Sequence, residues 1–214
     1  MENIFNGKSM KLVDIGNTHF HIYNGRIRHL KKPVKLEGEV FYISVNTQKE
    51  KEFLKLNPSA VNLKEYVKFN TLYANTLGID RIMACIAIED GVVVDAGSFI
   101  TLDVMEKGVH LGGVIMPGLY YLKEAYKKTP ALDVGFVYPT SVPPKNTKEA
   151  VSEGSIGMVV EMIKKYGENK KLYFTGGDGE YLAKILNGIY INDLVFQGMI
   201  KVIKEEYDNS FAKR

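Results

Sequence analysis

The sequence has one cysteine, no tryptophan and only seven prolines among its 214 residues. A single cysteine excludes an intramolecular disulfide framework, and the apolar neighbours of Cys85 are typical of a buried thiol in the reducing cytosol. No apolar run approaches the roughly 20 residues that span a bilayer, and residues 1–9 lack the pattern of a signal peptide. We therefore expect a cytoplasmic protein that is neither secreted nor inserted in a membrane.

The chain also lacks a strong excess of charge of either sign. It has 28 Lys and Arg residues and 25 Asp and Glu residues, which gives a formal net charge of +3. The basic residues are scattered along the sequence. This distribution gives no indication of a nucleic-acid partner. Hydrophobic residues make up 45% of the chain and charged residues 25%, which is the composition of a globular protein. A chain of this length can hold one large core or two small lobes.

Hydrophobic periodicity divides the chain into strands and helices. Period-two and continuous apolar runs predict strands over residues 11–15, 19–23, 26–30, 40–45, 92–96, 99–105, 109–115 and 171–174. Runs with a helical period predict helices over residues 48–56, 80–89, 118–127, 148–166, 181–186 and 193–207. Asn24 and Gly25 are the strongest two-residue signal for a hairpin, so we expect the chain to open as an antiparallel meander.

One short pattern occurs twice. Residues 13–17 read apolar, Asp, apolar, Gly, small polar, and residues 94–98 repeat this order about 80 residues later, each time before an alternating strand. The repeat predicts an α/β protein of two duplicated lobes that face each other across a central cleft. We expect a disordered or dispensable extension over residues 1–9, an N-terminal lobe over residues 10–90 and a C-terminal lobe over residues 91–214.

The first acidic turn, residues 14–18, combines groups that suit phosphate and metal. Asp14 ends a strand and could hold a hydrated Mg²⁺, while Gly16 lets backbone N–H groups approach phosphate oxygens. Asn17 and Thr18 add an amide and a hydroxyl at the same turn. The alternative is an ordinary hairpin turn with no ligand.

The second acidic turn, residues 95–98, repeats this pattern with Ser98 as the hydroxyl. A lone aspartate at a strand end could be a cap, but two equivalent ones favour a shared ligand, because buried carboxylates are costly without a cation or donors. Gly176 and Gly177 lie between a predicted strand and a helix, where a nucleotide could approach the backbone. A tight structural turn is the alternative there.

Two further groups of residues could carry chemistry. Asp80 and Arg81 stand at a predicted helix start, where Asp80 could accept the proton of a hydroxyl and Arg81 could bind an anionic group. A helix cap paired with its neighbour is the alternative. His19 and His21 share one face of a strand, but no third ligand follows at a fixed spacing, which argues against a zinc site.

Taken in order, residues 14–18, 78–81, 94–98 and 112–118 resemble the motifs of the type III pantothenate kinases, over a match that spans residues 11–179. The resemblance implies the actin, sugar kinase and Hsp70-like fold with two ribonuclease H-like lobes. It also implies a homodimer that uses ATP to phosphorylate pantothenate to 4′-phosphopantothenate, the first step toward coenzyme A. Pantothenate and ATP are then the expected partners, with neither nucleic acid nor membrane.

The resemblance also assigns roles to individual residues. The ATP-binding set comprises Asp14, Ile15, Gly16, Asn17, Thr18, His19, Phe20, His21 and Ser98, to which we add Gly176 and Gly177. The pantothenate set comprises Tyr73, Gly78, Ile79, Asp80, Arg81 and Thr147, with Asp80 as the proton acceptor. Asp14 would hold Mg²⁺ through the phosphates, and Asp95 would bind a monovalent cation, potassium or ammonium.

Two departures from the family pattern are visible. The family has Asp-Phe-Gly-Thr-Ala-Thr-Thr where residues 95–101 read Asp-Ala-Gly-Ser-Phe-Ile-Thr, and Tyr73 lies closer to Gly78 than the family tyrosine does. A sugar or acetate kinase of the same superfamily is one alternative. A non-catalytic ligand-binding protein is another, because relatives of this family are described as accessory factors in transcription. Retention of Asp14, Asp80 and Asp95 favours the kinase.

Overall fold

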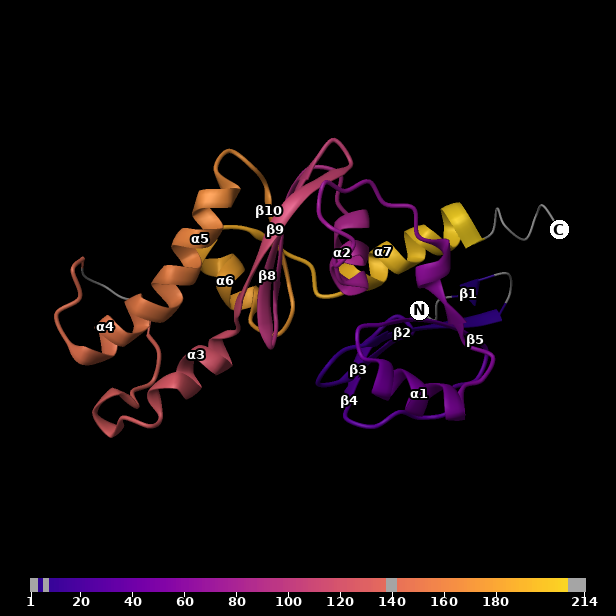
Figure 1. Cartoon of the computed structure of the whole chain (residues 1–214), viewed down its shortest axis with the longest axis horizontal. Helices are drawn as coiled ribbons and strands as arrows, with labels where there is room; N and C mark the ends of the chain where they lie inside the picture. Colours follow the sequence, from indigo (N-terminus) through magenta and orange to yellow (C-terminus); the bar gives the residue numbers. More distant parts are fainter. Residues whose placement is uncertain (1–3, 6–7, 138–141, 208–214) are drawn as a thin grey trace. The chain divides into compact units, whose positions relative to one another are not determined.

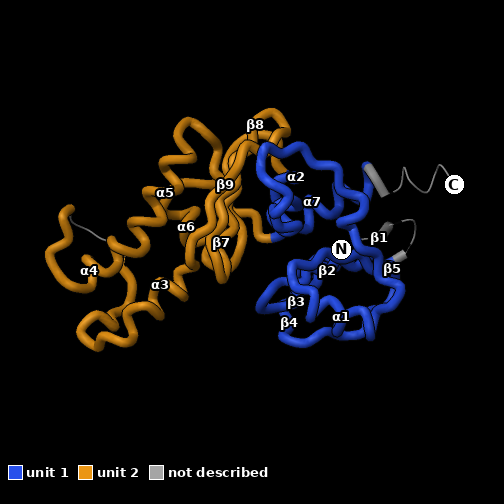
Figure 2. The backbone as a smooth tube through the Cα atoms, viewed as in Figure 1, with its two compact units in different colours: residues 1–87, 193–214 blue, residues 88–192 orange. Residues whose placement is uncertain are grey.

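A computed structural model of the chain describes residues 4–5, 8–137 and 142–207. The backbone forms two compact units (Figure 2): unit 1 comprises residues 1–87 and 193–214, and unit 2 comprises residues 88–192. Each unit contains one mixed β-sheet with its own helices (Figure 1).

Unit 1 is built on a sheet with the strand order β4-β3-β2-β5-β6, and β1 pairs with β2 outside this path. Its elements are β1 (Ile4–Phe5), β2 (Lys8–Ile15), β3 (Phe20–Tyr23), β4 (Ile27–Leu30), β5 (Glu39–Ser44), α1 (Thr47–Leu56), β6 (Val61–Asn62), the 3₁₀ helix η1 (Leu63–Tyr66), α2 (Ile79–Ile86), α7 (Leu194–Val202) and the π-helical turn η4 (Ile203–Tyr207). Strands β2, β3 and β4 form an antiparallel meander, whereas β5 and β6 continue the sheet in parallel with β2.

Unit 2 has the strand order β11-β10-β7-β8-β9. Its elements are β7 (Gly91–Ala96), β8 (Phe99–Glu106), β9 (Val109–Pro117), α3 (Leu119–Tyr126), the 3₁₀ helix η2 (Pro130–Leu132), α4 (Thr147–Ser152), the π-helical turn η3 (Glu153–Gly157), α5 (Met158–Gly167), β10 (Leu172–Thr175), α6 (Gly179–Leu186) and β11 (Ile189–Tyr190). The helix predicted over residues 148–166 is therefore continuous, with one π-helical segment between α4 and α5.

The duplicated α/β lobes predicted from the sequence are confirmed by strand topology. In both units three antiparallel strands are followed by two strands that run parallel to the first of them. A helix follows the first parallel strand in each unit, α1 in unit 1 and α6 in unit 2. Asp14 and Asp95 occupy equivalent places, each one residue before the end of its first strand.

Strand alternation explains how each sheet is buried. In unit 1, Val13, Ile15, Phe20 and Ile22 point to the face that packs on Phe53 of α1. In unit 2 the equivalent face packs against α5 and α6, through a cluster of buried residues that includes Val92, Val94, Ala96, Ile100, Leu102, Val159, Val160, Ile163, Phe174 and Leu182. Because successive side chains of a strand alternate, Asp14 and Asp95 lie on the opposite face from these clusters.

The C-terminal helix is placed differently from the prediction. The sequence analysis assigned residues 193–214 to the second lobe, but α7 packs against α2 in unit 1. Its Phe196 ring stacks on Tyr23 of β3, with 5.1 Å between the ring centroids. Gly198 approaches α2 so closely that a Cβ there would overlap the carbonyl of Met83. The helical period of residues 193–207 predicts the helix but does not identify the element on which it packs.

The N-terminal segment also differs from the expected disordered extension. Residues Ile4 and Phe5 form β1, which pairs antiparallel with Ser9 and Lys8 at the start of β2. The remaining residues of that expected extension, 1–3 and 6–7, lie outside the described part of the chain. Among the helices of the described residues, none has the length and apolar character needed to cross a membrane.

The packing of α7 on α2 gives a stability prediction. In an isolated helix, Gly198→Ala would be stabilising by about 0.5–1 kcal/mol. We expect it instead to lower the free energy of unfolding by about 1–3 kcal/mol, because the new methyl group would meet the Met83 backbone. Chemical denaturation measures the change, with Gly135→Ala as the control, since a Cβ at Gly135 meets no heavy atom within 4 Å. A stabilised Gly198→Ala protein would contradict this packing.

Candidate functional site

The residues singled out from the sequence are divided between the two units. Unit 1 holds the first acidic turn, Tyr73 and residues 78–81. Unit 2 holds the second acidic turn, Thr147, Gly176 and Gly177. The expectation that both acidic turns bind one ligand stays a prediction.

The first acidic turn is fastened to the start of α1. The N–H of Gly16 donates to the carbonyl of His19 at 3.0 Å, which closes the turn. The Oδ1 of Asn17 accepts a hydrogen bond from Asn46 Nδ2 at 3.3 Å, and Asn46 is the N-cap of α1. The turn thus lies beside a helix N-terminus, whose partial positive charge favours anions.

Not every residue assigned to ATP exposes its side chain at this turn. Asn17 and Thr18 are exposed, and Asp14, Gly16, His19 and His21 are half-buried. By contrast, Ile15 and Phe20 are 0% and 1% exposed in the core that faces α1. These two residues can therefore offer only backbone atoms to a ligand at the turn.

Three polar side chains stand in a row across the sheet of unit 1. Asp14 of β2 is opposite His21 of β3, which in turn is opposite His29 of β4. The Nδ1 atoms of His21 and His29 lie 2.7 Å apart, a hydrogen-bond distance. A Cβ on Gly16 would lie 3.7 Å from Nε2 of His21, so the other edge of the His21 ring faces the first acidic turn. His29 is absent from the sequence-derived site.

The surroundings of His21 favour its neutral form. Burial is the main cause that lowers the pKa of His21 from 6.5 to about 4, and the neighbouring positive charges of His29, His19 and Lys49 contribute to the same shift. The ammonium nitrogen of Lys49 lies 5.2 Å from the centre of the Phe20 ring. That nitrogen is buried without a hydrogen-bond partner among the described residues, and burial lowers the pKa of Lys49 as well.

Residues 78–81 and Tyr73 form one cluster at the start of α2. Gly78 is the N-cap, and Oδ1 of Asp80 accepts a hydrogen bond from the backbone N–H of Arg81 at 2.8 Å. The side chain of Arg81 is buried, at 6% exposure, and its guanidinium carbon lies 5.3 Å from the centre of the Tyr73 ring. Ile79 is buried in the same turn. The structure therefore brings Tyr73, Asp80 and Arg81 together, and their role in binding the substrate stays a prediction.

In unit 2 the glycine turn folds back onto the second acidic turn. Asp95 of β7 is opposite Thr175 of β10, and Gly176 follows with φ of +85°. A Cβ on Gly176 would lie 2.5 Å from Oδ1 of Asp95, so only glycine fits this close approach. The N–H of Asp178 donates to the carbonyl of Ala96 at 2.9 Å, which closes the contact.

Oxygen atoms gather around Asp95. Thr101 of β8 is directly opposite it, and the Thr101 hydroxyl oxygen is buried without a hydrogen-bond partner among the described residues. The Tyr190 hydroxyl lies 3.5 Å from the carbonyl oxygen of Gly176 and 3.1 Å from Asn192 Oδ1, and it can donate its one proton to either. Burial raises the pKa of Tyr190, and the charges of Glu180 and Asp95 add to the effect. Thr101 and Tyr190 were not singled out from the sequence as site residues.

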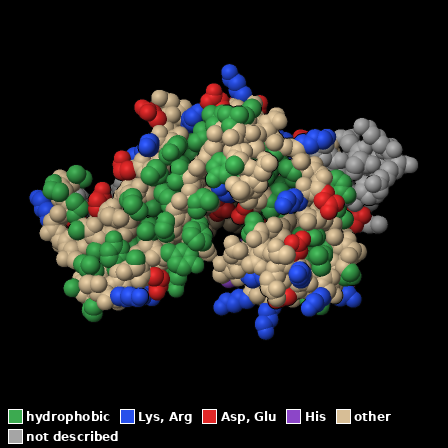
Figure 3. Space-filling view, in the orientation of Figure 1, with side chains coloured by type: hydrophobic (Ala, Val, Ile, Leu, Met, Phe, Trp, Pro, Cys, Tyr) green, Lys and Arg blue, Asp and Glu red, His purple; other side chains and the backbone are tan. Residues whose placement is uncertain are grey.

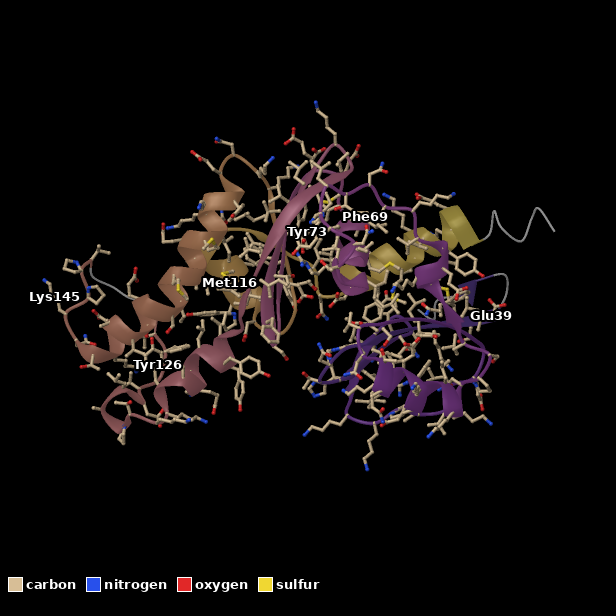
Figure 4. All side chains as sticks on the ribbon, in the orientation of Figure 1. Glu39, Phe69, Tyr73, Met116, Tyr126 and Lys145 are labelled. Atoms are coloured by element: carbon tan, nitrogen blue, oxygen red, sulfur yellow. The ribbon has the colours of Figure 1, made fainter. Side chains whose placement is uncertain are left out.

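Thr147 lies elsewhere in unit 2. It begins α4 and lines a pocket of about 570 Å³, together with Tyr126, Leu132, Pro144, Lys145, Asn146, Ala150 and Val151. Figure 2 places α4 at the far end of unit 2 from β7, and Figure 4 shows Tyr126 and Lys145 well away from Met116 on the sheet. Thr147 and the second acidic turn therefore lie far apart within unit 2.

Comparison with known proteins identifies the family of this chain. The model of the type III pantothenate kinase family matches residues 43–169. A type III pantothenate kinase of Wolinella succinogenes is 45% identical over 206 residues, which cover 92% of this chain and 97% of that protein. A Campylobacter jejuni protein with the same description is 43% identical, with the same two coverages.

Solved structures of similar fold were also found. A Campylobacter jejuni protein, provisionally assigned to the Baf family of transcriptional activators, superposes with a TM-score of 0.77 at 40% identity, covering 91% of this chain and 98% of that one. A Sinorhizobium meliloti protein, provisionally described as a 2-dehydro-3-deoxygalactonokinase, gives 0.54 at 10% identity, with coverages of 91% and 98%. The second likeness concerns the fold alone, and it agrees with the predicted actin, sugar kinase and Hsp70-like fold.

The environment of His21 can be tested by titration. We expect NMR titration of the histidine rings to give His21 a pKa of about 4, because burial penalises the charged ring. As the pH falls, His21 is protonated in the unfolded chain near pH 6.5 but in the folded protein only near pH 4. The free energy of unfolding therefore decreases between pH 6.5 and pH 4, and the effect of His21 on it is constant below pH 4. The variant His21→Asn should lack that slope. A His21 midpoint near the ordinary value would show that the ring is solvated.

Proposed function

Because this chain belongs to the type III pantothenate kinase family, we propose that it transfers the γ-phosphoryl group of ATP to the primary hydroxyl of pantothenate. The product is 4′-phosphopantothenate, and the reaction is the first step of coenzyme A biosynthesis. Family membership implies ATP as the phosphoryl donor together with a divalent metal. One observation carries the proposal at the level of residues: at the start of α2, the carboxylate of Asp80 accepts a hydrogen bond from the backbone N–H of Arg81, whose side chain is buried.

Asp80 is the proton acceptor for the attacking hydroxyl. The hydrogen bond from the Arg81 N–H to Oδ1 holds its carboxylate in one orientation at the first turn of α2. A Cβ on Gly78 would lie 2.5 Å from this oxygen, so glycine at the N-cap is what allows the orientation. Phosphoryl transfer depends mainly on positioning and electrostatics, and a fixed carboxylate can align the alcohol with the leaving oxygen.

Arg81 and Tyr73 bind the other end of the acceptor. Pantothenate carries a carboxylate, and a guanidinium matches the two oxygens of a carboxylate in one plane. The Tyr73 ring lies against the Arg81 guanidinium and restricts its rotation. Because Arg81 is only 6% exposed, a carboxylate that reaches it is partly removed from water, where the ion pair is stronger.

The two acidic turns bind the phosphates of ATP. The first offers the Gly16 turn beside the N-terminus of α1, and the second offers Ser98 with the glycine turn at Gly176 and Gly177. Bound Mg²⁺ supplies neutralisation of the charge on the transferred phosphoryl group. Asp14 is suited to hold this ion through the phosphates, since it is a half-buried carboxylate at the end of β2.

Asp95 is the ligand we propose for a monovalent cation, potassium or ammonium. The oxygens near it fit such an ion, because the buried Thr101 hydroxyl has no hydrogen-bond partner among the described residues and Gly176 leaves space where a side chain would collide. A carboxylate, a hydroxyl and backbone carbonyls are the donors that hard cations prefer. A cytoplasmic location also belongs to this proposal.

Unit 2 carries an exposed apolar face that suits a homodimer. Phe99, Ile115, Tyr120 and Tyr121 are between 46% and 63% exposed, and the rings of Phe99 and Tyr121 lie 5.6 Å apart. Figure 3 shows hydrophobic side chains gathered over α3 and the neighbouring strands of this unit. We place the dimer interface there. We also propose that Thr147 of the partner subunit completes the pantothenate-binding site, because Thr147 lies far from the sheet within its own unit.

A second candidate function has one specific observation in its favour. The Campylobacter jejuni structure at 40% identity is assigned to a family of transcriptional activators, so a ligand-binding protein without turnover is the competing hypothesis. A coupled assay with ATP, Mg²⁺, potassium and pantothenate separates the two. The kinase turns over pantothenate and fails with sugars or acetate, whereas the accessory factor binds ligand without releasing ADP.

The role of Asp80 gives a kinetic prediction. We expect Asp80→Asn to lower kcat by about 100-fold or more, because the amide can accept the Arg81 N–H but cannot take up the proton. The affinity for ATP, measured by calorimetry, should stay within about twofold. Asp133→Asn, an exposed aspartate, is the matched control and should be normal. Near-normal turnover of Asp80→Asn would refute its role as proton acceptor.

The composite site predicts complementation between two inactive variants. Asp80→Asn and Thr147→Val homodimers should both be poor enzymes, the second through a raised KM for pantothenate. After subunit exchange, half of the dimers are mixed and each carries one intact site, so activity should recover to about a quarter of the wild type. If Thr147 served the acceptor site of its own chain, mixing would restore nothing.

A further inference from the structure

His29 is a histidine that no part of the proposed mechanism uses, although it touches the candidate site. It lies on β4, the edge strand of the unit 1 sheet, directly opposite His21. Together with Asp14, the two rings form a row across three neighbouring strands on the face away from α1. The row therefore connects the surface of the edge strand with the first acidic turn.

The contact between the two rings restricts their protons. Their Nδ1 atoms lie 2.7 Å apart, and two imidazole nitrogens can form a hydrogen bond only when one carries a proton and the other does not. The rings are nearly perpendicular, at 87°, with their centres 4.8 Å apart. One ring thus donates from Nδ1 and the other accepts at Nδ1, which couples their tautomers.

The second nitrogen of His21 determines which of the two arrangements suits a phosphate. Its Nε2 faces the first acidic turn, near the space that Gly16 leaves open. Phosphate oxygens accept hydrogen bonds, so they need a proton on this Nε2. In the neutral ring, which burial favours, Nε2 carries the proton only when Nδ1 is the acceptor. His29 must then be the donor.

We propose that His29 is a positioning residue that donates its Nδ1 proton to His21 and so holds the His21 Nε2–H toward the phosphates of ATP. This inference rests on the proposed function, because the ligand at the first acidic turn is the nucleotide of that reaction. His29 itself touches no substrate. It acts by choosing the tautomer of His21 before ATP arrives, so that no proton has to be rearranged on binding.

The experiment compares three variants of the full-length protein. His29→Leu removes the donor, whereas His29→Asn keeps an N–H donor close to the position of Nδ1. Arg28→Leu is the control, because it removes an exposed polar side chain from the same strand without touching His21. Since His29 is exposed on an edge strand, all three proteins are expected to fold, which thermal unfolding checks.

The first readout is the tautomer of His21, from ¹⁵N NMR of the histidine rings without nucleotide. We expect a proton on Nε2 of His21 in the wild type, in Arg28→Leu and in His29→Asn, and a mixture of tautomers in His29→Leu. A proton on Nδ1 of His21 in the wild type would overturn the proposal. So would an unchanged tautomer in His29→Leu.

The second readout is nucleotide affinity. We expect His29→Leu to raise the KM and Kd for ATP about five- to tenfold, the size of one hydrogen bond, with the KM for pantothenate unchanged. His29→Asn should restore ATP binding to within about twofold. An equal loss in His29→Leu and His29→Asn, or in both substrates, would mean that His29 only supports the strand and would refute the tautomer role.

The two readouts also separate this inference from the function on which it rests. If the wild type shows the expected tautomer but neither binds nor hydrolyses ATP, the kinase proposal fails while the His29–His21 hydrogen bond stands. If the wild type is an active kinase and His29→Leu changes neither tautomer nor ATP affinity, the kinase stands and the role of His29 is wrong.

Discussion

The pairing register of each β-sheet decides which side chains stand beside the two strand-end aspartates. A carboxylate on a half-buried sheet face is stable only among donors, cations or water, so its lateral neighbours determine its chemistry. Asp14 has His21 on one side, whereas Asp95 has Thr101 and Thr175. The same backbone arrangement therefore presents imidazoles in unit 1 and hydroxyls in unit 2. Duplicated lobes can in this way serve one reaction with different groups.

Most regular elements could be predicted from the sequence, because hydrophobic period and turn residues are local signals. The repeated Asp-containing pattern even predicted the matching topology of the two sheets. The position of α7 could not be predicted in this way. Its helical period is clear, but its packing on α2 depends on the fit of Gly198 against the backbone of Met83, which lies far away in the sequence. The short strands β6 and β11 have only two residues each, too few for any period to appear.

The candidate site could be predicted where its residues are neighbours in sequence. It was harder to predict where the register between strands decides which side chains lie side by side. Residues 78–81 form the expected helix start, and the ring of Tyr73, eight residues earlier in the chain, lies against the guanidinium of Arg81. His29 was missed for a definable reason. A two-residue turn at Asn24 and Gly25 would have paired His21 with Arg28, but Tyr23 pairs with Ile27 across a three-residue loop. One extra loop residue thus exchanges an arginine for a histidine beside His21.

Gly118 gives the second acidic turn a mechanical connection to α3. Its N–H donates to the Ser98 carbonyl at 3.0 Å, and a Cβ at this position would overlap the carbonyls of Gly97 and Ser98. Because this contact is so close, we expect a ligand that moves the Ser98 backbone to move the first turn of α3 as well. That helix carries Tyr120 and Tyr121 on the exposed apolar face. If the nucleotide and the partner subunit bind where we propose, the two binding equilibria would be linked, so that each ligand would change the affinity for the other.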